Sequence, residues 1–96
     1  MISKSSDRQG GKVRVTFALP DDVGAEVYVC GEFNDWSRQA NRMGRADGRF
    51  VATLVLESGL RYRFRYLVDG SSWINDPEAD GHVDNTFGSE DSIVAT

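Results

Sequence analysis

A chain of 96 residues, 40% of them hydrophobic and 27% charged, is long enough for one small globular domain with a real core. The same length argues against a second domain and against a deep catalytic cavity. A net charge of −4 and a pI near 4.8 argue against nucleic acid as the main ligand and favour a neutral ligand, because phosphate contacts need a surplus of Lys and Arg on one face.

The cysteine content and the start of the chain bear on its location. The one cysteine, Cys30, lies in an apolar run and cannot form an intramolecular disulfide. Such a residue is typical of a core position in a reducing compartment. The opening segment, MISKSSDRQGGK, lacks the apolar run of a signal peptide, and no apolar stretch of membrane-spanning length occurs. The sequence therefore predicts a cytoplasmic protein that is not associated with a membrane.

The first third of the chain predicts a tail followed by strands. Residues 1–11 are polar and contain two glycines, so we expect a flexible tail ahead of a single domain that spans residues 12–96. Residues 12–19 alternate between apolar and polar side chains, which indicates a half-buried strand. Residues 25–31 are largely apolar, with Glu26 as the one charged residue, which is typical of a strand buried on both faces.

Two further strands are predicted in the second half of the chain. Residues 49–57 form one of them, and residues 60–70 alternate again, with aromatic residues in one row and Arg61, Arg63 and Arg65 in the other. The alternation predicts which side chains face the core. The predicted core residues are Val13, Val15, Phe17, Val29, Leu54, Phe64, Tyr66 and Val68.

Turn residues dominate the remaining segments. We expect turns at 32–48 with at most one short strand near 40–43, and a long polar loop at 78–90. A hairpin turn leads into the short strand SWIN, and residues 92–96 close the sheet. Six to eight short strands without a helical period predict an all-β fold, an antiparallel β-sandwich of immunoglobulin-like architecture. The Cys…Trp…Cys spacing of antibody domains is absent.

Two tryptophans, Trp36 and Trp73, each follow a turn and lie outside the alternating apolar rows. One interpretation is that they pack over an end of the sandwich, since tryptophan is usually well buried. The other is that both indoles face outward as a platform, because aromatic faces stack against the C–H faces of sugar rings. Arg65 is nearest to the turn before Trp73 and would donate hydrogen bonds to such a ligand, whereas Arg61 and Arg63 fit a solvated face.

Catalytic, metal and cofactor sites are not predicted. Asp76, Asp80, His82 and Asp84 fit neither a zinc motif nor a calcium loop, and we expect them in a solvated loop. The chain has 15 acidic residues, but a sandwich of this size has no walled cleft in which to raise the pKa of one carboxyl group and position another. Neither a phosphate-binding glycine loop nor a nucleophile motif is present, so we expect no enzymatic activity and no cofactor.

Four segments point to a known family. VYVCGEFNDW, YRFRYLVDG, SWINDP and NTFGSEDSIV, in this order, resemble the starch- and glycogen-binding modules of carbohydrate-binding module family 48, also called isoamylase N-terminal or early-set domains. The similarity covers roughly residues 12–95. Such modules precede the catalytic domain of glycogen branching and debranching enzymes, and one forms the glycogen-binding domain of the AMP-activated protein kinase β subunit. The resemblance implies an immunoglobulin-like sandwich that binds α-1,4-linked glucan.

The resemblance also implies a set of carbohydrate-binding residues. Trp36 and Trp73 match the two stacking tryptophans of the kinase-type module, and Arg65 stands where that module has a sugar-contacting lysine. Phe87 stands where it has a leucine that reaches into the curve of the glucan, and Asp91 falls near its ligand-binding asparagine. Arginine can still donate and phenylalanine can still stack, but Asp91 lacks the amide donor and adds a negative charge.

We therefore expect a stand-alone, non-catalytic module that binds α-glucan polysaccharide or maltooligosaccharide and that targets or regulates a partner enzyme of glycogen metabolism. Two alternatives stay open. One is a protein-interaction domain that kept the fold, since Trp and Arg are also favoured at protein interfaces. The other is an accessory domain of a glycogen branching or debranching enzyme.

Overall fold

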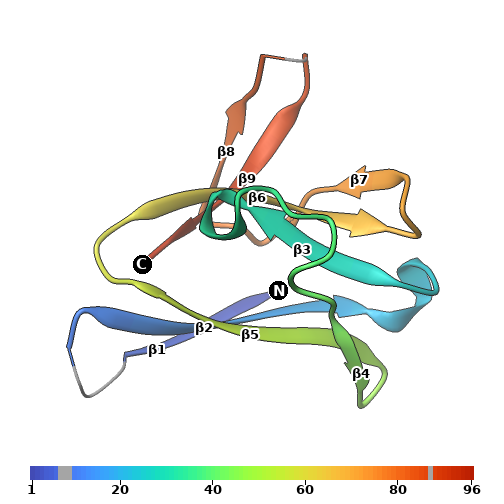
Figure 1. Cartoon of the computed structure of the whole chain (residues 1–96), viewed down its shortest axis with the longest axis horizontal. Helices are drawn as coiled ribbons and strands as arrows, with labels where there is room; N and C mark the ends of the chain where they lie inside the picture. Colours follow the sequence, from blue (N-terminus) through green and yellow to red (C-terminus); the bar gives the residue numbers. More distant parts are fainter. Residues whose placement is uncertain (7–9, 87) are drawn as a thin grey trace.

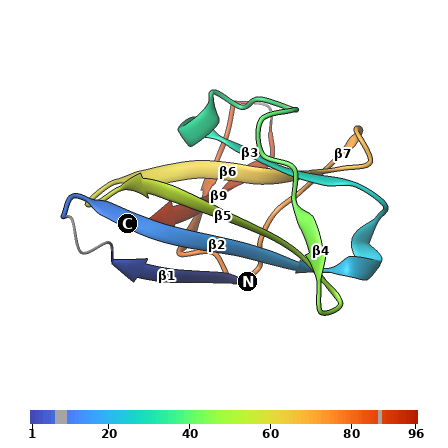
Figure 2. The ribbon, with the colours of Figure 1, turned by 60° about the horizontal axis from the view of Figure 1, so that its bottom comes forward.

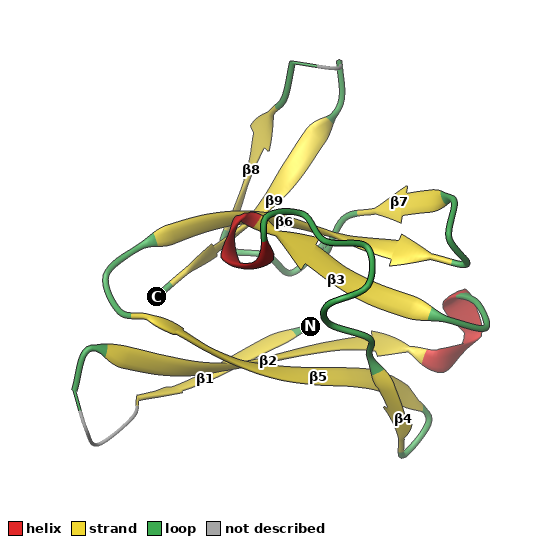
Figure 3. Cartoon of the chain, in the orientation of Figure 1, coloured by secondary structure: helices red, strands yellow, loops and turns green. Residues whose placement is uncertain are grey.

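Nine β-strands make up most of the chain that the computed structural model describes, which is residues 1–6, 10–86 and 88–96 (Figure 1). The helical segments within these ranges are two short 3-10 turns, Asp21–Val23 and Glu32–Asn34 (Figure 3). Neither of them has the length or the apolar character needed to cross a bilayer. The strands are β1 (Ile2–Ser6), β2 (Lys12–Pro20), β3 (Val27–Gly31), β4 (Gly44–Ala46), β5 (Arg49–Glu57), β6 (Arg61–Val68), β7 (Ser72–Ile74), β8 (Gly81–Asp84) and β9 (Glu90–Ala95).

The strands form two antiparallel sheets that pack face to face, as the sequence predicts. The four-stranded sheet has the order β1-β2-β5-β4. The five-stranded sheet has the order β3-β6-β9-β8, and β7 pairs with the free part of β6. In Figure 2 the layer that contains β1 and β2 lies below the layer that contains β3 and β6. The fold is therefore an all-β sandwich.

The core lies between the sheets and contains the predicted apolar rows. The Phe64 ring packs edge-on against its neighbours, with its centroid 5.1 Å from that of Phe17 and 5.6 Å from that of Tyr66. Leu54 is only partly buried, although it packs against the core. The other seven predicted core residues are buried: Val13, Val15, Phe17, Val29, Phe64, Tyr66 and Val68. The predicted faces of β6 are thus confirmed.

The first difference from the sequence prediction is β1. Residues 1–11 are expected as a tail, yet Ile2–Ser6 pairs with β2 and places Ile2 opposite Phe17. A strand added at a sheet edge is held by its backbone hydrogen bonds, so polar side chains do not prevent it from forming. Lys4 of this strand also forms an ion pair with Asp80, which directly precedes β8 of the other sheet.

Two further predictions are wrong in the loops. The segment 78–90 is not a loop throughout, because Gly81–Asp84 forms β8 and pairs with β9. Figure 1 shows the β8–β9 hairpin projecting from the body of the sandwich. Because β8 does not pack against the core, its sequence lacks the apolar–polar alternation that reveals a half-buried strand. The short strand expected near 40–43 lies at Gly44–Ala46 instead, and Arg42 contributes only an isolated bridge to Tyr28.

Asp76 also departs from the prediction, because its side chain is buried and not solvated. Its carboxylate accepts hydrogen bonds from the Tyr66 hydroxyl at 2.8 Å, the Glu78 amide at 2.8 Å and the Met1 amino group at 2.9 Å. Burial, and then the nearby Asp76 carboxylate, raise the pKa of Tyr66. Asp76 is therefore a structural residue, and the described ranges contain no group of three or more His, Cys, Asp or Glu side chains placed to hold a metal.

Candidate functional site

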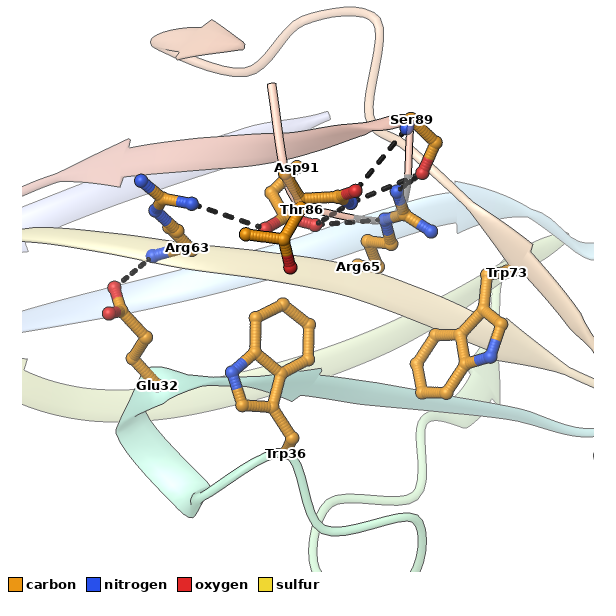
Figure 4. A pocket seen from close by; sticks show the side chains of 9 residues that line it. Glu32, Trp36, Arg63, Arg65, Trp73, Thr86, Ser89 and Asp91 are labelled. Carbon is orange, nitrogen blue, oxygen red and sulfur yellow. Dashed lines mark hydrogen bonds and ion pairs between the residues drawn. The ribbon is translucent and has the colours of Figure 1, made fainter. Parts of the chain in front are cut away.

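A hollow of about 730 Å³ opens on the outer side of the five-stranded sheet (Figure 4). Its floor is β6, and its walls come from the segment after β3, from β7 and from the β8–β9 hairpin. The sandwich fold thus brings together residues that are far apart in the sequence. The lining residues are Glu32, Trp36, Arg63, Arg65, Trp73, Asn85, Thr86, Ser89 and Asp91.

The floor rests on a second, smaller packed layer. Cys30 lies opposite Arg65 in the pairing of β3 with β6, so its side chain points away from the main core. Leu67 lies opposite Trp73 on the same outer side, and both Cys30 and Leu67 are buried. Burial raises the pKa of the Cys30 thiol to about 11, with Arg38 opposing the shift. The floor is therefore held from below by packed side chains.

A tight turn after β3 aims the Trp36 indole into the hollow. The Asn34 side chain accepts a hydrogen bond from the Gly31 amide and donates one to the Val29 carbonyl, both at 3.0 Å. Asp35 and Trp36 then adopt left-handed backbone conformations, with φ of 54° and 59°. The Trp36 amide donates to the Gly31 carbonyl at 2.8 Å, which closes the turn. The indole is therefore positioned by its own loop.

Trp73 reaches the same hollow from β7, which is hydrogen-bonded to β6. Figure 4 shows the two indoles next to each other along the hollow, and both side chains are half-buried. The guanidinium of Arg38 lies 5.5 Å from the centroid of the Trp73 ring, a cation–π contact that helps to fix the ring. The tryptophans are thus neither core residues nor fully exposed.

Arg65 links the floor to the β8–β9 hairpin. Its Nε donates to the Glu90 carbonyl at 2.9 Å and lies 3.1 Å from Asp91 Oδ1. Its Nη2 donates to the Ser89 hydroxyl and again to the Glu90 carbonyl. Because of these contacts the side chain is only 15% exposed. The hairpin wall is therefore held in place by an arginine of the sheet.

Asp91 is the buried anionic centre of the same network. Besides Arg65, its carboxylate accepts a hydrogen bond from the Asn85 amide at 3.2 Å and lies 3.8 Å from Arg63 Nη1. No buried side-chain polar atom in the described ranges lacks a hydrogen-bond partner. The negative charge that Asp91 adds, compared with an asparagine, is thus compensated inside the protein.

The charges that line the hollow balance one another. The two arginines, Arg63 and Arg65, stand against two carboxylates, Glu32 and Asp91. Glu32 accepts a hydrogen bond from the Arg63 backbone amide at 2.7 Å, so it is held beside the strand. A site with no net charge and two aromatic faces suits a neutral, amphipathic ligand.

Comparison with known proteins agrees with this geometry. The family described as the glycogen recognition site of AMP-activated protein kinase matches residues 12–93. The chain belongs to this family. The match to glycogen-recognition domains confirms the resemblance seen in the four sequence segments. It supports a carbohydrate-recognition module and does not favour the protein-interaction alternative.

Several relatives of this family are similar to the chain over most of its length. The 5'-AMP-activated protein kinase subunit beta-1 of Sus scrofa is 33% identical over 89 residues, which are 93% of this chain and 69% of the relative. The human beta-1 subunit is 32% identical over 89 residues, covering 93% of this chain and 31% of that subunit. The mouse beta-2 subunit is 37% identical over 66 residues, covering 69% and 23%. The chain therefore spans less than a third of the human and mouse subunits.

Four of the five binding residues predicted from the sequence line the hollow. The structure places Trp36, Arg65, Trp73 and Asp91 in its lining, and their roles toward a ligand stay predictions. Phe87, the fifth predicted residue, lies outside the described residues. Five lining residues were missed by the sequence analysis: Glu32, Arg63, Asn85, Thr86 and Ser89.

Some of the missed residues carried a signal. Arg63 lies two positions before Arg65 on the same strand, so the two side chains share a face. Asn85, Thr86 and Ser89 lie within the NTFGSEDSIV segment, and Glu32 lies within VYVCGEFNDW. Both segments carry part of the resemblance, but the resemblance did not give these four residues a role.

Proposed function

We propose that this domain binds α-1,4-linked glucan of the glycogen or starch type through the hollow on the five-stranded sheet, and that it performs no reaction on it. The observation that carries the proposal is the position of Trp36 and Trp73, whose indoles line one hollow with Arg65. Each indole covers the C–H face of one or two glucose units. The charge-balanced lining suits a neutral polymer.

Polar groups at the edge of the platform would bind the sugar hydroxyl groups. The bonds described for Arg65 use its Nε and Nη2 atoms, which leaves Nη1 to donate to a hydroxyl group. The Arg63 side chain is 44% exposed and can do the same at the other end of the floor. Thr86 and Ser89 add hydroxyl groups from the hairpin wall.

The carboxylates of the hollow do not form an acid–base pair. Glu32 accepts from a backbone amide and Asp91 is engaged by arginine and asparagine side chains. Glycoside hydrolysis needs one carboxyl group that donates a proton and a second one that attacks or activates water. We therefore expect no release of reducing ends and no branch formation when the purified chain is incubated with glycogen, starch or maltooligosaccharides.

The decisive experiment is a titration of the protein with maltoheptaose while tryptophan fluorescence and heat are recorded. We expect a Kd of about 10 μM to 1 mM, because the site is open and shallow. Trp36→Ala and Trp73→Ala should each raise this Kd by about tenfold, with the unfolding free energy changed by less than about 1 kcal/mol.

Two controls make the titration specific. Arg14→Ala on the exposed outer side of the four-stranded sheet should leave the Kd unchanged. Cellohexaose, a straight β-1,4-linked glucan, should bind more weakly than maltoheptaose because it cannot follow the two ring faces. If the wild-type protein stays folded and binds no maltoheptaose, the proposal is overturned. The protein-interaction alternative would then be favoured.

We further propose that the domain brings a partner enzyme of glycogen metabolism to the polysaccharide. The relatives are subunits named for a protein kinase, and this chain spans only a part of them. The test is co-sedimentation of a kinase-family partner with glycogen in the presence of this domain, with the Trp36→Ala variant as the control. A cytoplasmic location is the setting in which this targeting would operate, and it stays a prediction of the sequence.

A further inference from the structure

The β8–β9 hairpin has two faces of different composition. Val83 lies opposite Asp91 in its register, and Asp84 lies opposite Glu90. Since side chains alternate along a strand, the face with Asp91 belongs to the hollow described above, and Asp84 and Glu90 lie on the other face. Figures 1 and 3 show the hairpin standing out from the sandwich, and His82, Asp84 and Glu90 on this other face are exposed.

A second hollow, of about 510 Å³, lies on this other face. Ser89 lines both hollows, so the hairpin is a thin wall between them. The lining residues of the second hollow are Asn75, His82, Asp84, Gly88, Ser89 and Glu90.

The second hollow is fixed by hydrogen bonds to the body of the domain. The Asn75 amide donates to the Glu90 carbonyl at 2.9 Å, and its Oδ1 accepts from the Ser92 hydroxyl at 2.8 Å. His82 Nε2 lies 2.9 Å from the Asp76 carbonyl, and because a carbonyl only accepts, Nε2 must donate. In the neutral imidazole this leaves Nδ1 as an acceptor.

The lining is rich in acceptors. Three of its groups accept hydrogen bonds, and all three belong to exposed residues: His82 Nδ1 and the carboxylates of Asp84 and Glu90. Two carboxylates, with no arginine or lysine among the described lining residues, disfavour an anionic ligand. A ligand that supplies many hydroxyl donors and carries no negative charge fits this set.

We propose that the second hollow is a subsite for the same α-glucan chain, which passes over the hairpin at Ser89 after leaving the tryptophan platform. This inference rests on the proposed function. The chain would stack in the first hollow and would be held by hydrogen bonds in the second, because the described lining of the second hollow contains no Phe, Tyr or Trp. Short oligosaccharides would fill the first hollow alone, and longer ones would reach both.

The test compares two oligosaccharides and two double variants. The variant Asp84→Ala with Glu90→Ala removes acceptors of the second hollow, and the variant Asp21→Ala with Asp22→Ala removes the same charge at an exposed turn elsewhere. We expect the first variant to raise the Kd for maltoheptaose about three- to tenfold and to leave the Kd for maltotriose unchanged. The control variant should bind both sugars as the wild type does.

The one histidine of the chain provides a direct reporter. The imidazole proton resonances of His82 should shift when maltoheptaose is added to the wild-type protein and should stay in place with maltotriose. If the resonances do not move and both double variants bind maltoheptaose alike, the subsite does not exist, although the proposed function stands. If the wild type binds neither sugar, the proposed function itself has failed.

Discussion

The two faces of strand β6 have different roles, one in the core and one in the candidate site. On the inner face, Phe64 and Tyr66 are fully buried between the sheets. On the outer face, Arg63 and Arg65 form the floor of the hollow. The same eight residues, Arg61–Val68, therefore supply both the core and the site through the period-2 alternation of a strand. Neighbouring substitutions should consequently separate stability from ligand binding.

The largest effect should come from the inner face. Phe64→Ala should lower the free energy of unfolding by about 3 to 5 kcal/mol, because the ring is fully buried among Phe17 and Tyr66 and its removal leaves a cavity. Urea denaturation followed by circular dichroism measures the change. The matched control is Val55→Ala, since Val55 is 51% exposed and its truncation should stay within about 0.5 kcal/mol. Equal effects of the two substitutions would contradict the face assignment.

The second effect tests whether the outer face is packed beneath its site. Burial raises the pKa of Cys30 from 9.0 to about 11, so the thiolate population near pH 8 is about a hundredfold lower than for an ordinary thiol. We expect iodoacetamide to alkylate the folded protein at least that much more slowly than the urea-unfolded protein at the same pH. Mass spectrometry follows the reaction. Similar rates in the two states would mean that the floor of the hollow is open to solvent.

A smaller change in the free energy of unfolding should come from Arg65, because this residue of the outer face also contributes to stability. Arg65→Ala removes the closest ionic partner of the buried Asp91 and three hydrogen bonds to the hairpin, so the free energy of unfolding should fall by about 1 to 3 kcal/mol. Arg63→Ala is the matched control, because its guanidinium lies farther from Asp91, at 3.8 Å, and its side chain is 44% exposed. The expected change for the control is within about 0.5 kcal/mol. Thermal denaturation of both variants decides whether Arg65 is structural as well as functional.

The smallest effect concerns the ion pair between Lys4 and Asp80 at the rim of the sandwich. Burial tends to raise the pKa of Asp80, but the Ala95 amide and Lys4 outweigh it, so the pKa is lowered from 3.8. The resulting stabilisation is present above this unfolded-state value and is lost as the pH falls through the folded-state pKa. It should be below about 1 kcal/mol, since both side chains are about a third exposed.

Asp80→Asn tests this pH dependence. The difference in unfolding free energy between wild type and variant should shrink as the pH is lowered from neutral toward the acid range, where the wild-type carboxylate becomes protonated. Asp22→Asn, at an exposed position, is the control for the loss of one negative charge. A difference that stays constant across the acid range would rule out an ionic contribution from Asp80.

The sequence predicted most of the sandwich because its inner strands carry a regular pattern. β2, β5 and β6 alternate or are apolar over eight or nine residues, and one face of each is buried. β8 was missed because it lies in a projecting hairpin with no buried face. β1 was missed because an edge strand is held by its backbone.

The candidate site divides in the same way. Trp36 and Trp73 stood out because large aromatic residues followed turns and matched a family motif. The ion pair between Arg65 and Asp91 depends on the antiparallel pairing of β6 with β9, which connects positions 26 residues apart and leaves no local trace. Asp76 looked like a solvated residue for the same reason, since its partner Tyr66 lies on a different strand.

The backbone of Trp36 has a consequence for how such a domain evolves. Its φ of 59° is a conformation that costs a residue other than glycine about 1 to 2 kcal/mol. Selection for stability alone would favour glycine or asparagine at this position. A large aromatic residue held there against this preference marks a trade-off, in which the domain gives up some thermodynamic robustness to keep an indole at its surface.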